Sequence, residues 1–169
     1  MTSTHAADER VQKEEVRFYT TRGEYGCFSN FYWKKIDGKV QFVIDGKAYK
    51  TVEHFFQSQK PTDPKRQEEI RNATSPGQAA TMGRARKDTT LRPNWNRLRN
   101  KVMLVGCMAK FSQNPHLAEK LLATGDKVII EHTRKDAYWG DGGDGSGRNE
   151  LGKTLMEVRA AIRAERSLQ

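Results

Sequence analysis

The 169-residue sequence has few of the residues that build metal sites and disulfides. It contains two cysteines, Cys27 and Cys107, and four histidines, and all six are dispersed. No C-x-x-C motif and no H-x-x-x-H pair occurs, so neither a zinc site nor a disulfide framework is expected. We predict that the chain binds no metal and needs no cofactor. Its thiols are expected to be reduced, as in a cytoplasmic or nuclear protein.

Long apolar runs are also missing. No segment approaches the ~20 consecutive apolar residues that span a bilayer, and the first 15 residues lack the apolar region of a secretory signal. We therefore predict no membrane association. Residues 1–13 are polar and charged and are expected to form a disordered tail, which leaves one domain at residues 14–166.

The charge balance is basic. The chain has 30 Lys+Arg against 21 Asp+Glu, a net charge of +9. Such a surplus favours a polyanionic partner, such as nucleic acid, a phosphorylated ligand or anionic lipid. The cations are scattered, with no run of five, so an ordinary basic surface explains them equally well.

The hydrophobic periodicity predicts an α+β fold, a single compact domain dominated by helices with a small β-sheet. Strands are predicted at residues 14–19, 39–45 and 127–133, and the Asp45-Gly46 pair predicts a hairpin turn. Helices are predicted at residues 51–60, 64–72, 76–86, 95–113, 115–124 and from 150 onward. Apolar residues at steps of three and four predict the buried stripe of the longest helix: Trp95, Leu98, Val102, Val105, Met108 or Ala109, and Phe111.

The predicted helix at residues 51–60 carries the first candidate site. Glu53, Gln57 and Lys60 are spaced i, i+4 and i+7, which places a carboxylate, an amide and an amine on one helix face. Two phenylalanines lie beside this face, and the following proline leaves the lysine at the helix terminus. The same spacing also occurs on ordinary solvated helix faces, so the pattern alone leaves both interpretations open.

A glycine-rich stretch after the last predicted strand carries the second candidate site. Asp136 and Trp139 suit a sugar or heterocycle, because the ring stacks on the indole and the carboxylate accepts from a hydroxyl or amine. The loop at residues 140–147 precedes a helix that Asn149 is expected to cap, so its backbone N–H groups are candidates for phosphate binding. The stretch matches neither the P-loop, nor the dinucleotide fingerprint, nor a calcium loop.

Three further segments have two interpretations each. Residues 23–33 combine turn formers with aromatic side chains, which suits either a ligand-binding loop or an aromatic plug of the core. Trp95 could stack on a ligand ring or lie at the edge of the core. The basic residues at 84–87 could contact phosphate or complement a helix C-terminus.

Several of these motifs together resemble the YbiA-like, or NADAR, family over roughly residues 15–163. The resemblance implies a single compact domain with N-glycosidase activity. It is specific, because several separate motifs occur in the expected order. In chain order they are Phe28-Ser-Asn-Phe31, Glu53-His-Phe-Phe-Gln57 with Gln59-Lys60, Trp95 with Arg99 and Met103, Lys110-Phe111, and Trp139-Gly140 through Asn149-x-Leu-Gly152 to Leu155-Met156.

The resemblance implies two groups of substrates. One comprises early intermediates of riboflavin synthesis, in which a pyrimidine is detached from ribose phosphate. The other is ADP-ribose attached to guanine bases in nucleosides or DNA, which the basic charge favours. In both, an exocyclic amine is joined to the anomeric carbon of ribose. The competing hypotheses are a non-catalytic ADP-ribose-binding module and a plain nucleic-acid binder that uses scattered cations.

The resemblance also implies roles for single residues. Lys60 would attack the anomeric carbon as a neutral amine and form a Schiff base, with Glu53 moving protons and Asp136 holding ribose hydroxyls or acting as a second acid–base group. A rival mechanism activates water with the two carboxyl groups. The expected ligand-binding residues are Phe28, Ser29, Asn30, Gln57, Gly83, Arg84, Trp95, Trp139, Gly140 and Asn149.

Overall fold

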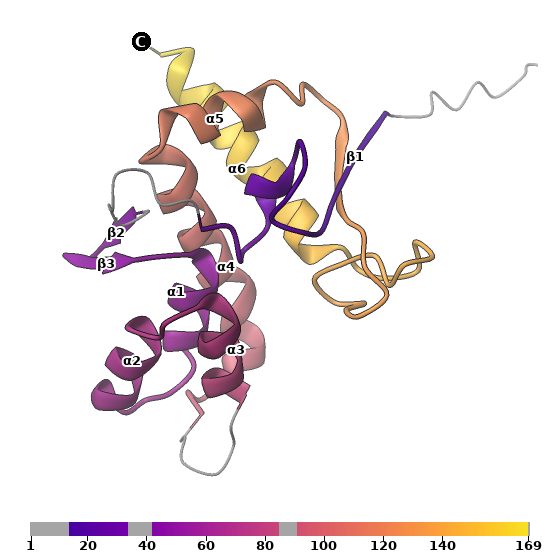
Figure 1. Ribbon diagram of the computed structural model, residues 1–169. Coiled ribbons are helices and arrows are strands. Elements are labelled where there is room, and N and C mark those ends of the chain that lie inside the picture. The colour runs from indigo at the N-terminus through magenta and orange to yellow at the C-terminus, as the bar shows by residue number, and fades with distance from the viewer. Residues whose placement is uncertain (1–13, 34–41, 85–90, 169) are drawn as a thin grey trace, which may run out of the picture.

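Figure 1 shows the fold in a computed structural model that describes residues 14–33, 42–84 and 91–168. The helices are α1 (Val52–Ser58), α2 (Pro64–Arg71), α3 (Pro76–Arg84), α4 (Trp95–Ser112), α5 (Pro115–Leu122) and α6 (Glu150–Arg166), with a short 3-10 helix η1 (Gly26–Phe28). The strands are β1 (Glu15–Phe18), β2 (Phe42–Ile44), β3 (Lys47–Tyr49) and β4 (Val128–Glu131). The prediction of a helix-dominated α+β domain is confirmed. The predicted tail at 1–13, the start of the second predicted strand and the basic residues at 85–87 lie outside the described residues.

The strands form two small pairs. β2 and β3 are an antiparallel hairpin whose turn residues Asp45 and Gly46 both have positive φ, 49° and 74°, as the sequence predicts. β1 and β4 pair in parallel, with Phe18 opposite Glu131. The parallel register places the carboxyl ends of β1 and β4 side by side, although they are far apart in the sequence. No helix in the described ranges is both long and apolar enough to cross a membrane.

Helix α4 is the centre of the fold and contacts α1 on one side and α5 and α6 on others (Figure 1). The predicted buried stripe of α4 is partly wrong. Val105 is 40% exposed, whereas Met103 and Lys110 are each only 1% exposed. The cause is the approach of α1, since a Cβ added at Gly106 would lie only 2.8 Å from Cδ1 of Phe55. Because α4 is covered from more than one side, its buried residues extend beyond a single apolar stripe.

The loop before β2 contributes a core residue. Phe28 is fully buried, and its ring packs edge-on against Phe18 and Phe111, with ring centroids 5.8 Å and 6.1 Å away. Lys110, which lies off the predicted apolar stripe, donates from Nζ to the Ser29 carbonyl at 3.0 Å and holds this loop against α4. The aromatic loop is thus a core plug at Phe28, while its next residues turn towards a cavity.

We expect Phe28→Ala to lower the free energy of unfolding by about 3–5 kcal/mol, because it empties a closed aromatic cluster. Phe31→Ala is the matched control, since that ring is 36% exposed and its removal should cost less than about 1 kcal/mol. Urea denaturation followed by circular dichroism measures both. Equal losses for the two variants would contradict the assignment of Phe28 to the core.

Candidate active site

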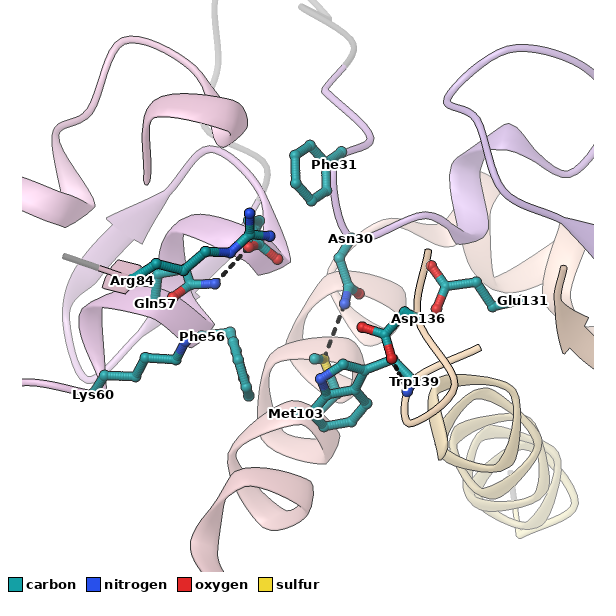
Figure 2. A pocket seen from close by; sticks show the side chains of 11 residues that line it. Asn30, Phe31, Phe56, Gln57, Lys60, Arg84, Met103, Glu131, Asp136 and Trp139 are labelled. Atoms are coloured by element: carbon teal, nitrogen blue, oxygen red, sulfur yellow. Dashed lines mark hydrogen bonds between the residues drawn. The ribbon is translucent and has the colours of Figure 1, made fainter. Parts of the chain in front are cut away.

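A cavity of about 200 Å³ is lined by residues of α1, α3 and α4, by the last residue of β4, and by the loops that follow η1 and β4. Figure 2 shows its lining: Lys60, Gln57 and Arg84 lie on one side, Asp136 and Trp139 on the other, and Asn30 between them. The lining contains three carboxyl groups and two cations, which are Glu53, Glu131, Asp136, Lys60 and Arg84.

Helix α1 supplies one wall of the cavity. The Thr51 side chain caps its N-terminus by accepting from His54 N, which begins the helix where the sequence predicts. The helix ends at Ser58, two residues before Lys60, but Lys60 N still donates to the Gln57 carbonyl at 3.2 Å. Glu53, Gln57 and Lys60 therefore line one cavity, as their spacing predicts.

Burial perturbs both titratable groups of this wall. The pKa of Lys60 is lowered, mainly because its amine is desolvated and further because Arg84 and Arg99 are nearby, while Glu53 opposes the shift. The pKa of Glu53 is raised, mainly by burial. Gln57 Nε2 donates to Glu53 Oε1 at 2.7 Å and fixes the carboxyl group. The site thus holds an amine that loses its proton more easily than an ordinary lysine, together with an acid that keeps its proton to a higher pH than an ordinary glutamate.

Asp136 and Trp139 form the opposite wall. Oδ1 of Asp136 accepts from the backbone N–H groups of Tyr138 and Trp139, both at 2.8 Å, which fixes the turn and the indole. The Trp139 ring packs edge-on against Phe56, 5.4 Å away between centroids. Neither oxygen of Asp136 accepts from another described side chain, so the carboxylate remains available to a ligand in the cavity.

Two buried acceptors of the cavity have no hydrogen-bond donor within the described residues. They are Asn30 Oδ1 and Gln57 Oε1. Asn30 Nδ2 donates to the Met103 sulfur at 3.2 Å, which turns the amide oxygen away from the core. Both residues line the cavity, but the two oxygens themselves are shielded from solvent, and Gln57 Oε1 faces Gly83.

Two of the predicted aromatic ligand contacts are not brought to this cavity. Phe28 is fully buried in the core, and Trp95 is 7% exposed and packs on Phe56 with ring centroids 5.1 Å apart. Trp95 therefore supports the ring that faces the ligand and does not itself line the cavity. Ser29 lies outside the cavity as well, and its hydroxyl accepts from Phe31 N at 3.2 Å.

Gly140 and Asn149 have supporting positions. A Cβ at Gly140 would lie 2.7 Å from Thr133 Cγ2, so close packing excludes a side chain there. Asn149 has φ 51° and makes no side-chain cap, contrary to the predicted cap of α6. Its amide instead accepts from Glu131 N at 3.0 Å and donates to the Ile129 carbonyl at 2.8 Å. Asn149 therefore ties the glycine-rich loop to β4.

The predicted phosphate contact of loop 140–147 is not supported. Its backbone N–H groups are largely used within the loop, where Asp141 accepts from Gly143 N through Oδ1 and from Gly145 N and Gly147 N through its carbonyl. Arg84, at the exposed end of α3, lines the cavity together with Lys60 and is the candidate for contact with phosphate. Among the described side chains, no group of three or more His, Cys, Asp or Glu residues is placed to hold a metal ion.

Comparison with known proteins identifies the family to which this domain belongs. The NADAR domain profile matches residues 17–163. The chain belongs to the NADAR family. N-glycosidase YbiA of Escherichia coli K12 is 46% identical over 156 residues, which cover 92% of this chain and 93% of that protein. N-glycosidase Npun_R5314 of Nostoc punctiforme is 36% identical and covers 88% of this chain and 92% of that protein.

A third relative and a solved structure extend the comparison. Riboflavin biosynthesis protein VVA0006 of Vibrio vulnificus is 38% identical over 90% of this chain, which corresponds to 40% of that longer protein. The NMR structure of E. coli YbiA superimposes with a TM-score of 0.83 at 44% identity, and the match covers 94% of this chain and 90% of that one. The predicted family and fold class are confirmed.

Four residues that line the cavity of this NADAR domain were not assigned a ligand role from the sequence. Three of them, Phe31, Phe56 and Met103, belong to the family motifs, and the fourth, Glu131, does not. Glu131 is the most consequential of them, because it adds a third carboxyl group. The sequence predicts it only as part of a β-strand. The one available signal is its position as the last residue of β4, since a carboxylate that follows Val-Ile-Ile ends an otherwise apolar strand.

Gly83 sits behind the cavity of this NADAR domain. A Cβ there would overlap the amide oxygen of Gln57 and lie 2.9 Å from its Cβ. We expect Gly83→Ala to displace Gln57, release Glu53 and lower kcat/KM about 10-fold, which corresponds to about 1.4 kcal/mol. Gly77→Ala in the same helix is the matched control, since the added Cβ meets only Ser75 Oγ at 3.8 Å. Steady-state kinetics should leave Gly77→Ala unchanged, and equal kinetics for both variants would contradict this role of Gly83.

Proposed function

We propose that this N-glycosidase removes ADP-ribose from ADP-ribosylated guanine bases, in nucleosides or DNA, through a Schiff base on Lys60. The observation that carries the proposal is the pairing of Lys60, whose pKa is lowered, with Glu53, whose pKa is raised, in one cavity. Relatives with the printed name N-glycosidase support cleavage of an N-glycosyl bond. The net charge of +9 supports a substrate linked to nucleic acid.

The proposed reaction begins with opening of the ribose ring. The carboxyl group of Glu53 protonates the ring oxygen, the bond from that oxygen to the anomeric carbon breaks, and an iminium forms between the anomeric carbon and the base nitrogen. The neutral amine of Lys60 adds to the anomeric carbon and gives a proton to the Glu53 carboxylate. Glu53 passes this proton to the base nitrogen, whose bond to carbon breaks and frees the base.

Hydrolysis then regenerates the enzyme. Departure of the base leaves an iminium between Lys60 and the anomeric carbon, and water adds to this carbon and gives a proton to the Glu53 carboxylate, so that the iminium charge is lost. The bond from the carbon to the Lys60 nitrogen then breaks, the second proton of the added water passes to that nitrogen, and the sugar leaves as an aldehyde that closes to free ADP-ribose. In this scheme Asp136 accepts from ribose hydroxyls, Asn30 orients the ligand, Gln57 holds the Glu53 carboxyl group in place, and Trp139 covers the sugar. Arg84 at the rim meets phosphate oxygens.

The second candidate function is hydrolysis of early riboflavin-pathway intermediates. The name of the Vibrio vulnificus relative favours it, as a riboflavin biosynthesis protein. The bond is of the same type, because ribose is again joined to an exocyclic amine, so the same residues would act. A non-catalytic ADP-ribose-binding module is less well supported, since such a module needs neither a neutral lysine nor a proton carrier.

The testing experiment compares two substrates with the wild-type protein. One is a short DNA with ADP-ribosylated guanine, and the other is a ribosylaminopyrimidine phosphate. We expect release of ADP-ribose, restoration of guanine and a larger kcat/KM for the DNA substrate. Turnover of the pyrimidine substrate alone would assign the riboflavin-pathway function, and tight ADP-ribose binding without turnover of either would assign a binding module. Binding that falls steeply with salt, without ADP-ribose dependence, would indicate a plain nucleic-acid binder.

A further inference from the structure

A second cavity of about 260 Å³ adjoins the active-site cavity. The two cavities share Phe31 and Glu131, which stand between them. The remaining lining residues of the second cavity are Tyr19, Thr20, Thr21 and Ser29. A molecule bound across Glu131 would therefore reach both cavities at once.

The parallel pairing of β1 with β4 builds this second cavity. Phe18 is opposite Glu131, and His132 N donates to the Phe18 carbonyl at 2.9 Å, so the residues that follow β1 lie beside Glu131. Tyr19 is 41% exposed and Phe31 is 36% exposed, although both are large and aromatic. Two uncovered rings on one small cavity suit a planar heterocycle.

The carboxyl group of Glu131 lies between the two cavities and accepts no hydrogen bond from the described residues. Its backbone is fixed on both sides, since its N–H donates to Asn149 and its carbonyl accepts from Asp141 N at 2.9 Å. Its carboxyl group has no hydrogen bond or ion pair with any described residue. Burial raises its pKa to about 7, and the carboxyl groups of Asp136, Glu53 and Asp141 add to the rise.

The position of this unpaired carboxyl group between the two cavities indicates the kind of partner it would take. A half-buried carboxylate surrounded by other carboxylates is stabilised by N–H donors, and two donors on one planar edge match its two oxygens. Figure 2 places Glu131 on the Asp136 side of the site, across from Lys60. A ribose bound at Lys60 would thus direct its attached base towards Glu131.

We propose that the second cavity is the subsite for the base that is released, and that Glu131 recognises an amino-substituted pyrimidinone ring through its N–H donors. The inference rests on the proposed function and names how the guanine of that substrate is held. In guanine the exocyclic amine that carries the ribose keeps one N–H, and the adjoining ring N–H lies next to a carbonyl, so one carboxylate can accept from both donors. A carboxylate at this position therefore selects guanine and rejects rings without these donors.

The test uses two small rings as probes, isocytosine, which is an amino-substituted pyrimidinone, and the pyrimidinone without the amino group. Binding is followed by NMR through the backbone amide signals of Thr20, Thr21 and Trp139. We expect isocytosine to shift the two threonine signals and to bind at least about 10-fold more tightly than the pyrimidinone, as the loss of one charge-assisted hydrogen bond predicts. In Glu131→Gln the two probes should bind alike.

Glu157→Gln, a change of the same kind at an exposed position of α6, should keep the wild-type preference. The amide spectra also report whether each variant is folded. Isocytosine shifts confined to Trp139, or an unchanged preference in Glu131→Gln, would overturn the subsite. The binding assay needs no turnover. If isocytosine bound as expected but no substrate were hydrolysed, the proposed function would be rejected and the subsite would not.

Discussion

Lys60→Ala should lower kcat by at least about 10³-fold, the scale expected when a covalent nucleophile is removed. Borohydride added during turnover of ADP-ribosylated guanosine should trap a sugar adduct on the wild-type protein and none on this variant. The physical reason is the position of the amine, which lies in a cavity with Glu53 and over the ring of Phe56 at 5.4 Å from its centroid. Mass spectrometry of the trapped protein places the adduct.

Lys65→Ala is the matched control, because Lys65 is an exposed lysine of α2 outside the cavity. It should keep wild-type kinetics and trapping. Lys60→Arg should not restore activity, since a guanidinium stays protonated and cannot attack. Turnover by Lys60→Ala, without any adduct in the wild type, would reject the imine and leave Glu53 and Asp136 acting on water.

The lowered pKa of Lys60 also sets a pH dependence. The neutral fraction of the amine rises as the pH passes the lowered pKa, so kcat/KM should climb on the acidic side of the profile at a lower pH than an ordinary lysine would give. The raised pKa of Glu53 extends its protonated form upward in pH. The two pKa shifts therefore widen the pH range in which neutral Lys60 and protonated Glu53 occur together.

Local signals in the sequence predicted the wall that α1 supplies. The threonine cap, the i, i+4, i+7 spacing and the following proline all act within ten residues, so Glu53, Gln57 and Lys60 reach one cavity as expected. The Asp45-Gly46 hairpin was predictable for the same reason, because two positive φ angles are a local requirement.

Contacts between distant segments decided what the sequence could not predict. Helix α4 is packed by α1, by α6 and by the loop at Ser29, so its buried surface includes Lys110, which lies off the predicted apolar stripe. The amides of the glycine-rich loop are taken by Asp141, which no spacing rule indicates. Glu131 enters the cavity only because β4 pairs with β1, and Trp95 is excluded because Phe56 covers it.

Glu53→Gln should lower kcat by about 10²–10⁴-fold, the contribution of a positioned proton carrier. The substitution keeps the side-chain size and removes only the titratable proton. Glu53 is 6% exposed and is held by Gln57, so its carboxyl group has a fixed position in the cavity. Asp136 lies on the opposite wall and is fixed by its own turn. Turnover close to that of the wild type would reject Glu53 as the proton carrier.

The same variant should gain stability as its activity is lost. The pKa of Glu53 is raised in the folded protein, so the folded state binds more protons than the unfolded state once the pH exceeds the ordinary value of 4.5. Wild-type stability then falls as the pH rises through the folded pKa, while glutamine has no such dependence. Urea denaturation at pH 5 and pH 8 should show Glu53→Gln gaining on the wild type at the higher pH, with Glu157→Gln showing no such gain. Proton transfer explains why the protein keeps a carboxyl group that destabilises its folded state. If the difference in stability between Glu53→Gln and the wild type did not grow with pH, this explanation would be wrong.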